Sequence, residues 1–110
     1  MLEERMREIE ARIRGARNLP ESEREKLLSL VATLRREVAT LPASQAEDAH
    51  SITHFLAAST HEASRTTKHP KLLEAARDGL LASAEKFETT HPRLFDAAGQ
   101  LALVLGNMGL

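Results

Sequence analysis

Apolar residues recur at alternating spacings of four and three along the first part of the chain, with charged residues between them. This spacing gathers apolar side chains on one side of an α-helix, and it predicts helices over about residues 2–17 and 22–40. A short connection, Asn18-Leu19-Pro20, joins them, so residues 1–41 are expected to form an antiparallel, coiled-coil-like hairpin. The two apolar seams are Leu2, Met6, Ile9, Ile13 and Ala16, and then Leu27, Val31, Leu34, Val38 and Leu41.

Two serines are each followed three residues later by a glutamate, which is the pattern of a capping box at a helix start. Ser22 with Glu25 would begin the second helix, and Ser44 with Glu47 would begin a third helix over about residues 45–66. Small residues in the seam of this third helix favour close packing against a neighbouring helix. That seam is Ala49, Ile52, Leu56, Ser59 and Ala63, with Phe55 beside it.

An internal repeat begins the last two helices. The segment HPKLLEAA at residues 69–76 returns as HPRLFDAA at residues 91–98. Proline fits the first position of a helix, and the residue before it is kept out of the α conformation, so His69 and His91 are expected to be helix caps. The repeat predicts helices over about residues 70–88 and 92–107, with Leu73, Ala76, Leu80, Ala84 and Phe87 inward on the first of them.

The final helix carries an apolar stripe beside a stripe of small residues, Ala98, Ala102 and Gly106. A helix with two such sides is expected to be held by neighbours on both. We predict a homodimer whose interface is either this helix or the hairpin of residues 1–41. Packing of the small stripe inside a single chain is the alternative and remains open here. The interface candidates on this helix are Leu94, Ala98, Leu101, Ala102, Leu105 and Met108.

Length and composition place these helices in a single all-α domain, residues 1–110, in which residues 44–110 add three helices to the hairpin. Only 3% of the residues are aromatic, as helix–helix packing allows and a sheet does not favour.

The 15 basic and 16 acidic residues are interspersed, so a nucleic-acid partner is not expected. Glu3–Arg7, Glu8–Arg12 and Glu10–Arg14 have the spacing of helical ion pairs. No signal peptide or membrane-length apolar run occurs, so we expect a cytoplasmic protein that does not bind membranes.

Histidines on the third helix give the one candidate metal site. Glu47, His50, His54 and His61 are spaced by three, four and seven residues, so they share one side of that helix. Imidazoles at a spacing of four can chelate zinc, nickel or copper, and Glu-x-x-His occurs in di-iron bundles. Glu47, His54 and His61 also fall opposite the apolar seam, with His50 next to that face, where all four would be solvent-exposed side chains with no ligand. We expect exposure, with metal binding as the alternative.

No motif in the sequence predicts catalysis. There is no cysteine, no glycine-rich phosphate loop and no nucleophile elbow, so no catalytic residue and no cofactor are assigned. The sequence therefore favours a non-enzymatic, homo-oligomeric interaction or scaffold protein. The alternatives are a metal-binding protein that uses the third-helix histidines and a peripheral membrane binder that uses the apolar C-terminal helix.

The C-terminal half also resembles a known family. The segment FETTHPRL at residues 87–94, the apolar helix that follows and the ending GNMGL at residues 106–110 resemble the signature of a small bacterial family catalogued as domain of unknown function 4404. Residues 59–63 and 71–74 are similar to members of that family as well. The resemblance implies a small helical bacterial protein and implies no activity, cofactor or catalytic residue.

Overall fold

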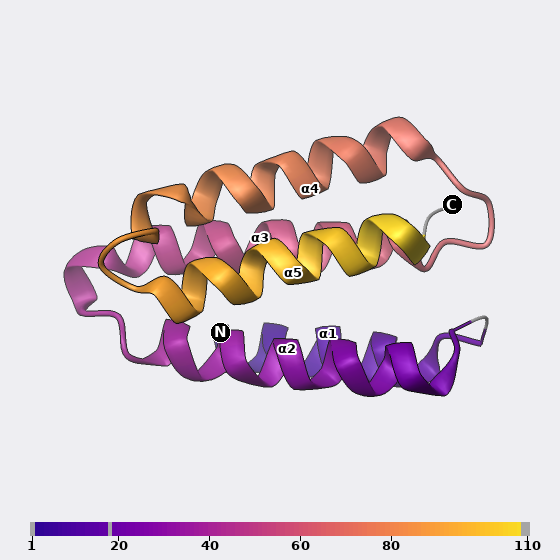
Figure 1. Cartoon of the computed structure of the whole chain (residues 1–110), viewed down its shortest axis with the longest axis horizontal. Helices are drawn as coiled ribbons and strands as arrows, with labels where there is room; N and C mark the ends of the chain where they lie inside the picture. The colour runs from indigo at the N-terminus through magenta and orange to yellow at the C-terminus, as the bar shows by residue number, and fades with distance from the viewer. Residues whose placement is uncertain (1, 18, 109–110) are drawn as a thin grey trace.

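Five α-helices and two short 3₁₀ turns make up the computed structural model, which describes residues 2–17 and 19–108 (Figure 1). No strand occurs in those residues, which confirms the all-α prediction. Four helices lie within three residues of the predicted ranges, and the fifth, predicted over 70–88, is divided into α4 and the 3₁₀ turn η2. Their bounds are α1 Leu2–Gly15, α2 Glu21–Ala39, α3 Ala46–Ala63, α4 Pro70–Ala84 and α5 Pro92–Met108, with η1 Ala43–Gln45 before α3 and η2 Glu85–Phe87 after α4.

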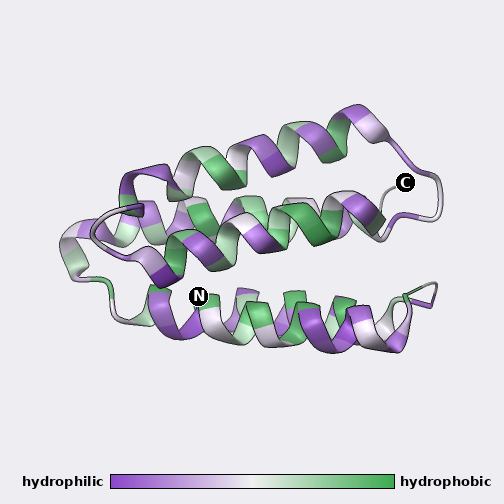
Figure 2. Ribbon diagram, in the orientation of Figure 1, coloured by the Kyte–Doolittle hydropathy of each residue, from purple (hydrophilic) through white to green (hydrophobic). Residues whose placement is uncertain are grey.

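Successive helices run in opposite directions and form a bundle. Helices α1 and α2 lie side by side as a hairpin, α3 packs on α1, α5 packs on α2, and α4 packs on α3 and α5 on the side away from the hairpin (Figure 1). Among the described residues, α3 and α5 each contact three other helices. In Figure 2 the hydrophobic residues of the hairpin turn toward the three other helices. The core therefore lies between the hairpin and helices α3 and α5, and it extends between these two helices and α4.

The core consists of the predicted seams. Met6, Ile9 and Ile13 of α1 are buried, as are the four central seam residues of α2, whereas the end residues Leu2 and Ala16 are partly buried. All five seam residues of α3 and all five inward residues of α4 and η2 are buried as well. Each large aliphatic or aromatic side chain buried in this way contributes roughly 1.5–3 kcal/mol to stability. The periodicity of the sequence therefore identified the core correctly.

Prolines directly precede α2 and η1, and the predicted capping boxes are wrong. Pro20 precedes α2, and its carbonyl oxygen accepts from Arg24 N at 3.0 Å. Pro42 precedes η1 in the same way, and its carbonyl oxygen accepts from Gln45 N at 2.8 Å. The fixed φ of proline directs the next residue into a helical turn, so α2 and η1 begin one and two residues earlier than the predicted helix starts. Ser22 and Ser44 then lie inside the helical turns, where a capping role is not open to them.

The two copies of the repeat share the proline start but differ in their caps. Pro70 and Pro92 are the first residues of α4 and α5, as predicted. The His69 ring caps α4, because its Nδ1 accepts a hydrogen bond from Leu72 N at 3.3 Å. The His91 ring instead lies 3.0 Å from Thr90 Oγ1 through its Nδ1 and packs edge-on against Phe87. The carbonyl oxygen of His91 accepts from Phe95 N at 3.1 Å, so both histidines directly precede their helices as predicted, and the described hydrogen bonds show a cap by the ring for His69.

Ion pairs cross the hairpin where the sequence favoured pairs within α1. Arg35 of α2 binds Glu3 with its Nε and one terminal nitrogen, and its other terminal nitrogen lies 3.2 Å from Glu10 Oε1. Two of the three acids predicted to pair locally are thus used to fasten α1 to α2. A guanidinium group has the planar donor array that such a bridge needs.

Candidate functional site

The four metal candidates lie on the exposed side of α3. Glu47, His50, His54 and His61 are all exposed, with their seam neighbours turned into the core. His50 and His54 border a shallow hollow against Leu2 and Glu8 of α1, while His61 lies near Glu62 with 3.9 Å between Nε2 and Oε2. The arrangement matches a solvated polar face.

These side chains do not converge on a common point. Across residues 2–17 and 19–108, no three His, Cys, Asp or Glu side chains come close enough together to hold a metal ion. A site of that kind requires three or four ligands at fixed short distances. The geometry therefore gives the metal-binding alternative no support.

The interface candidates of α5 are occupied inside the chain. Five of the six are at most 1% exposed, and Met108 is half-buried. Surface that is already buried against α2, α3 and α4 cannot be buried a second time against another subunit. The same holds for the central hairpin seams. These residues therefore belong to the core of one chain, which was the open alternative. Because the apolar face of α5 is buried, it is also not available to contact a membrane surface. The interface candidates are Leu94, Ala98, Leu101, Ala102, Leu105 and Met108.

The opposite side of α5 carries an unusual pair of residues. Leu103 is 59% exposed, more than any other large hydrophobic residue in the described part of the chain. Gly99 lies one turn before it on the same side of the helix, and a Cβ added there would meet no described atom within 4 Å. The polar neighbours on this side include Asp96, whose Oδ2 accepts from Gln100 Nε2 at 2.8 Å. The exposed Leu103 thus lies beside a glycine with open space above it, and the neighbouring side chains carry amide and carboxylate groups.

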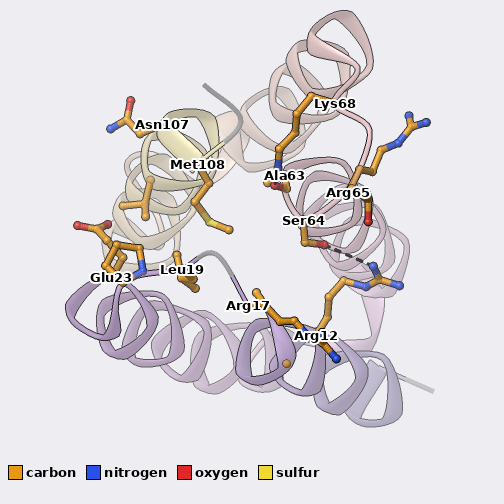
Figure 3. A pocket seen from close by; sticks show the side chains of 15 residues that line it. Arg12, Arg17, Leu19, Glu23, Ala63, Ser64, Arg65, Lys68, Asn107 and Met108 are labelled. Atoms are coloured by element: carbon orange, nitrogen blue, oxygen red, sulfur yellow. Dashed lines mark hydrogen bonds between the residues drawn. The ribbon is translucent and has the colours of Figure 1, made fainter.

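A cavity of about 800 Å³ opens at the end of the bundle where α1, α3 and α5 finish (Figure 3). Three segments that are far apart in sequence line it: residues 12–23, residues 63–68 and residues 104–108. Its volume falls in the range of small-molecule pockets, about 300–1,000 Å³. The turns that connect α1 to α2 and α3 to α4 leave this end uncovered.

The lining changes from cationic at the surface to apolar at depth. Leu19, Ala63 and Val104 are buried beneath the cavity, while Arg12, Arg17 and Lys68 around it are exposed. In Figure 3 Met108 and Ala63 turn toward the space between the helices, and the guanidinium group of Arg65 points away from it. Arg65 is paired with Glu62 at 2.9 Å, so it takes no part in the site. The remaining acidic residue of the lining is Glu23.

The carbonyl groups at this end are already bound by other cations. Arg24 donates hydrogen bonds to the carbonyl oxygens of Ile13, Arg14, Ala16 and Leu19 at 2.6–3.1 Å, which closes the end of α1. Lys68 Nζ donates to Ala63 O at 2.5 Å at the end of α3. The partial negative charge of these helix ends is therefore compensated locally.

Sequence reasoning did not find this cavity. Its basic residues are scattered between residues 12 and 68 among acids, so no run or motif marks them. The hydrogen bond from Arg12 to Ser64 Oγ, 3.4 Å long, joins residues that are 52 positions apart. Only the antiparallel order of the helices brings these segments together. The sequence feature closest to this site is the group Arg12, Arg14 and Arg17 near the predicted end of the first helix.

Comparison with known proteins gives a family and no function. No curated protein and no solved structure is significantly similar to the chain. Of the helices in the described residues, none is both long and apolar enough to cross a bilayer. The profile of a family described as Domain of unknown function (DUF4404) matches residues 31–110, which take in the C-terminal part of α2 and all of the described residues of α3, α4 and α5. This match confirms the resemblance seen in the C-terminal half and extends it toward the N-terminus. The chain belongs to the DUF4404 family.

Proposed function

We propose that the protein is a non-enzymatic interaction protein that assembles as a homodimer through the exposed side of α5. The observation that carries this proposal is Gly99, an unfilled helical position beside the highly exposed Leu103. The proposed interface lies opposite the buried residues that the sequence offered as candidates.

Glycine in a helix interior costs about 1 kcal/mol relative to alanine. For two other glycines inside helices, a contact within the chain explains why glycine is present despite this cost. A Cβ at Gly79 would collide with the ring of Phe55, and one at Gly106 would collide with the guanidinium group of Arg77. Gly99 has no such neighbour among the described residues. Close approach of a second molecule to α5 would explain why glycine occupies position 99.

The pair is suited to a two-fold symmetric contact. If two copies of α5 cross in antiparallel directions near Gly99, Leu103 of each copy can cover Gly99 of the other. Such an interface is isologous, so one surface serves both subunits. The amide and carboxylate groups of Asp96, Gln100 and Asn107 would form its polar rim.

Sedimentation equilibrium of single variants tests the interface. Leu103→Lys introduces a charge at the centre of the proposed contact, so the variant should remain monomeric at concentrations where the wild type is a dimer. Leu72→Lys is the matched control, because Leu72 of α4 is also exposed, at 44%, and lies outside the proposed face. The control should dimerise like the wild type. Equal dimerisation of both variants, or a wild type that remains monomeric, would refute the proposal.

A further inference from the structure

The two ends of the bundle carry opposite charge although the chain as a whole is nearly neutral. At the cavity end, residues 12–24 and 62–71 contain seven basic and three acidic residues. At the opposite end, residues 2–5, 36–48 and 85–96 contain four basic and eight acidic residues. The cavity therefore lies at the positive end, where the field of the protein attracts anions.

Within residues 2–17 and 19–108, two of the basic residues at the cavity form no ion pair with a carboxylate. Arg12 donates to the neutral hydroxyl group of Ser64, and Lys68 donates to a backbone carbonyl group. An ammonium group has three N–H donors, so Lys68 retains capacity for a further acceptor. Arg17 is an exposed member of the same lining. A carboxylate among these groups would gain charge-assisted hydrogen bonds.

We propose that the cavity binds an anionic amphiphile, an aliphatic carboxylate whose head group lies among Arg12, Arg17 and Lys68 and whose chain enters toward Leu19 and Val104. Met108 is half-buried, lines the cavity and turns toward the space between the helices (Figure 3). A methionine side chain is unbranched and adaptable, so it can move aside and pack along an aliphatic chain. This ligand site lies at the end of the bundle and is independent of the proposed dimer contact on the side of α5.

The order of the lining with depth favours a free ligand over a membrane surface. Cations surround the cavity and the apolar residues lie beneath them, so the chain of the ligand has to point into the protein. A lipid in a bilayer presents its head group first and keeps its chains in the membrane. Such a lipid could reach the cations but not the apolar floor.

Calorimetric titration with decanoate, below the concentration at which it forms micelles, tests the proposal. Saturable binding of one decanoate per chain is expected. Acetate, which lacks the chain, and decanol, which lacks the charge, should bind much more weakly. Equal binding of decanol, or no saturable binding of decanoate, would overturn the proposal. Co-sedimentation with phosphatidylglycerol vesicles but no binding of decanoate would also overturn it, in favour of a membrane surface.

Charge-neutralising variants locate the site. Arg12→Gln/Arg17→Gln should weaken decanoate binding by roughly tenfold or more, because two charge-assisted contacts are lost. Arg5→Gln/Arg36→Gln removes the same charge at the opposite end and should bind decanoate like the wild type. If thermal unfolding shows that the first double variant is not folded, the single variant Arg17→Gln decides the point. Unchanged affinity in the folded cavity variant would contradict the assignment.

Discussion

The guanidinium group of Arg77 lies against Gly106, in the space that a Cβ at Gly106 would occupy. From there Arg77 Nε donates a hydrogen bond to the carbonyl oxygen of Ala102 at 2.6 Å. The bond fastens α4 to the middle of α5 and ends on a backbone group. The small residues Ala102 and Gly106 thus leave room for the side chain of Arg77. Their presence in the small stripe therefore does not imply close contact between two helix backbones.

We predict that Gly106→Ala uncouples Arg77 from α5. The added methyl group displaces the end of a flexible side chain, so the hydrogen bond is lost at a cost of about 0.5–1.5 kcal/mol. Alanine regains about 1 kcal/mol in helix propensity, so the free energy of unfolding should stay close to that of the wild type. A double-mutant cycle checks the coupling: Arg77→Ala should cost less in the Gly106→Ala background. Equal costs in both backgrounds would contradict this role of Gly106.

Gly79→Ala should behave differently, although its Cβ also meets a side chain. The contact is with the ring of Phe55, including Cγ at 2.8 Å, which cannot move without a change of χ1. Helices α3 and α4 would have to separate or Phe55 would have to leave its site. We expect a loss of about 1–3 kcal/mol in the free energy of unfolding, measured by denaturant titration. Stability equal to that of the wild type would show that the ring is free to move.

Ser59→Ala should stabilise the protein. The Ser59 hydroxyl group is buried and has no hydrogen-bond partner among the described residues. An unsatisfied buried polar group costs about 1–3 kcal/mol, so its removal should raise the free energy of unfolding. Thr53→Val is the control, because Thr53 is also buried but its Oγ1 donates to Ala49 O at 2.8 Å. A gain in the control and none in Ser59→Ala would contradict the prediction.

The pKa of Glu3 should show whether the ion pair between Glu3 of α1 and Arg35 of α2 is formed. The hydrogen bond from Arg35 lowers the pKa of the Glu3 carboxyl below its ordinary value of 4.5. A carboxyl whose pKa is lower in the folded state stabilises the fold above its unfolded pKa, and this contribution is lost as the pH falls through the lowered value. In an NMR titration, Arg35→Gln should return the pKa of Glu3 toward 4.5. Arg36→Gln should leave it lowered; the same pKa in all three proteins would refute the pairing.

Gly99→Ala separates the two possible roles of Gly99. In a monomer the change should raise the free energy of unfolding by about 1 kcal/mol, because helix propensity improves and the Cβ meets no atom. In the proposed dimer the same methyl group lies between two copies of α5, so the dimer should dissociate at higher concentration. Thermal unfolding at low concentration and sedimentation equilibrium measure the two effects on one variant. A stabilised variant with unchanged association would remove Gly99 from the interface.

The sequence predicted the helices and the core because both follow from local spacing. Leu27, Val31 and Leu34 repeat with the period of a helix, and burial follows that period. The helix starts were less predictable, because a proline and a capping serine compete within two residues. At Pro20 and Pro42 the fixed backbone angle decided the start.

The candidate sites depended on contacts that no local pattern contains. Arg35 has acids near it in sequence, yet it binds Glu3 and Glu10 on the other helix. Gly99, Gly79 and Gly106 look alike in the sequence, and only their surroundings distinguish a tight contact from an empty one. The end cavity likewise exists only once three chain segments meet.

The absolute mass of the protein in solution tests the central proposal most directly. Light scattering coupled to size exclusion, repeated over a wide range of concentrations, measures this mass without reference to shape. A dimer through α5 predicts a mass of about twice the 12.1 kDa of one chain, falling toward that of one chain on dilution. A mass of 12.1 kDa at every concentration would contradict the homodimer and leave the exposed Leu103 without a partner of its own kind.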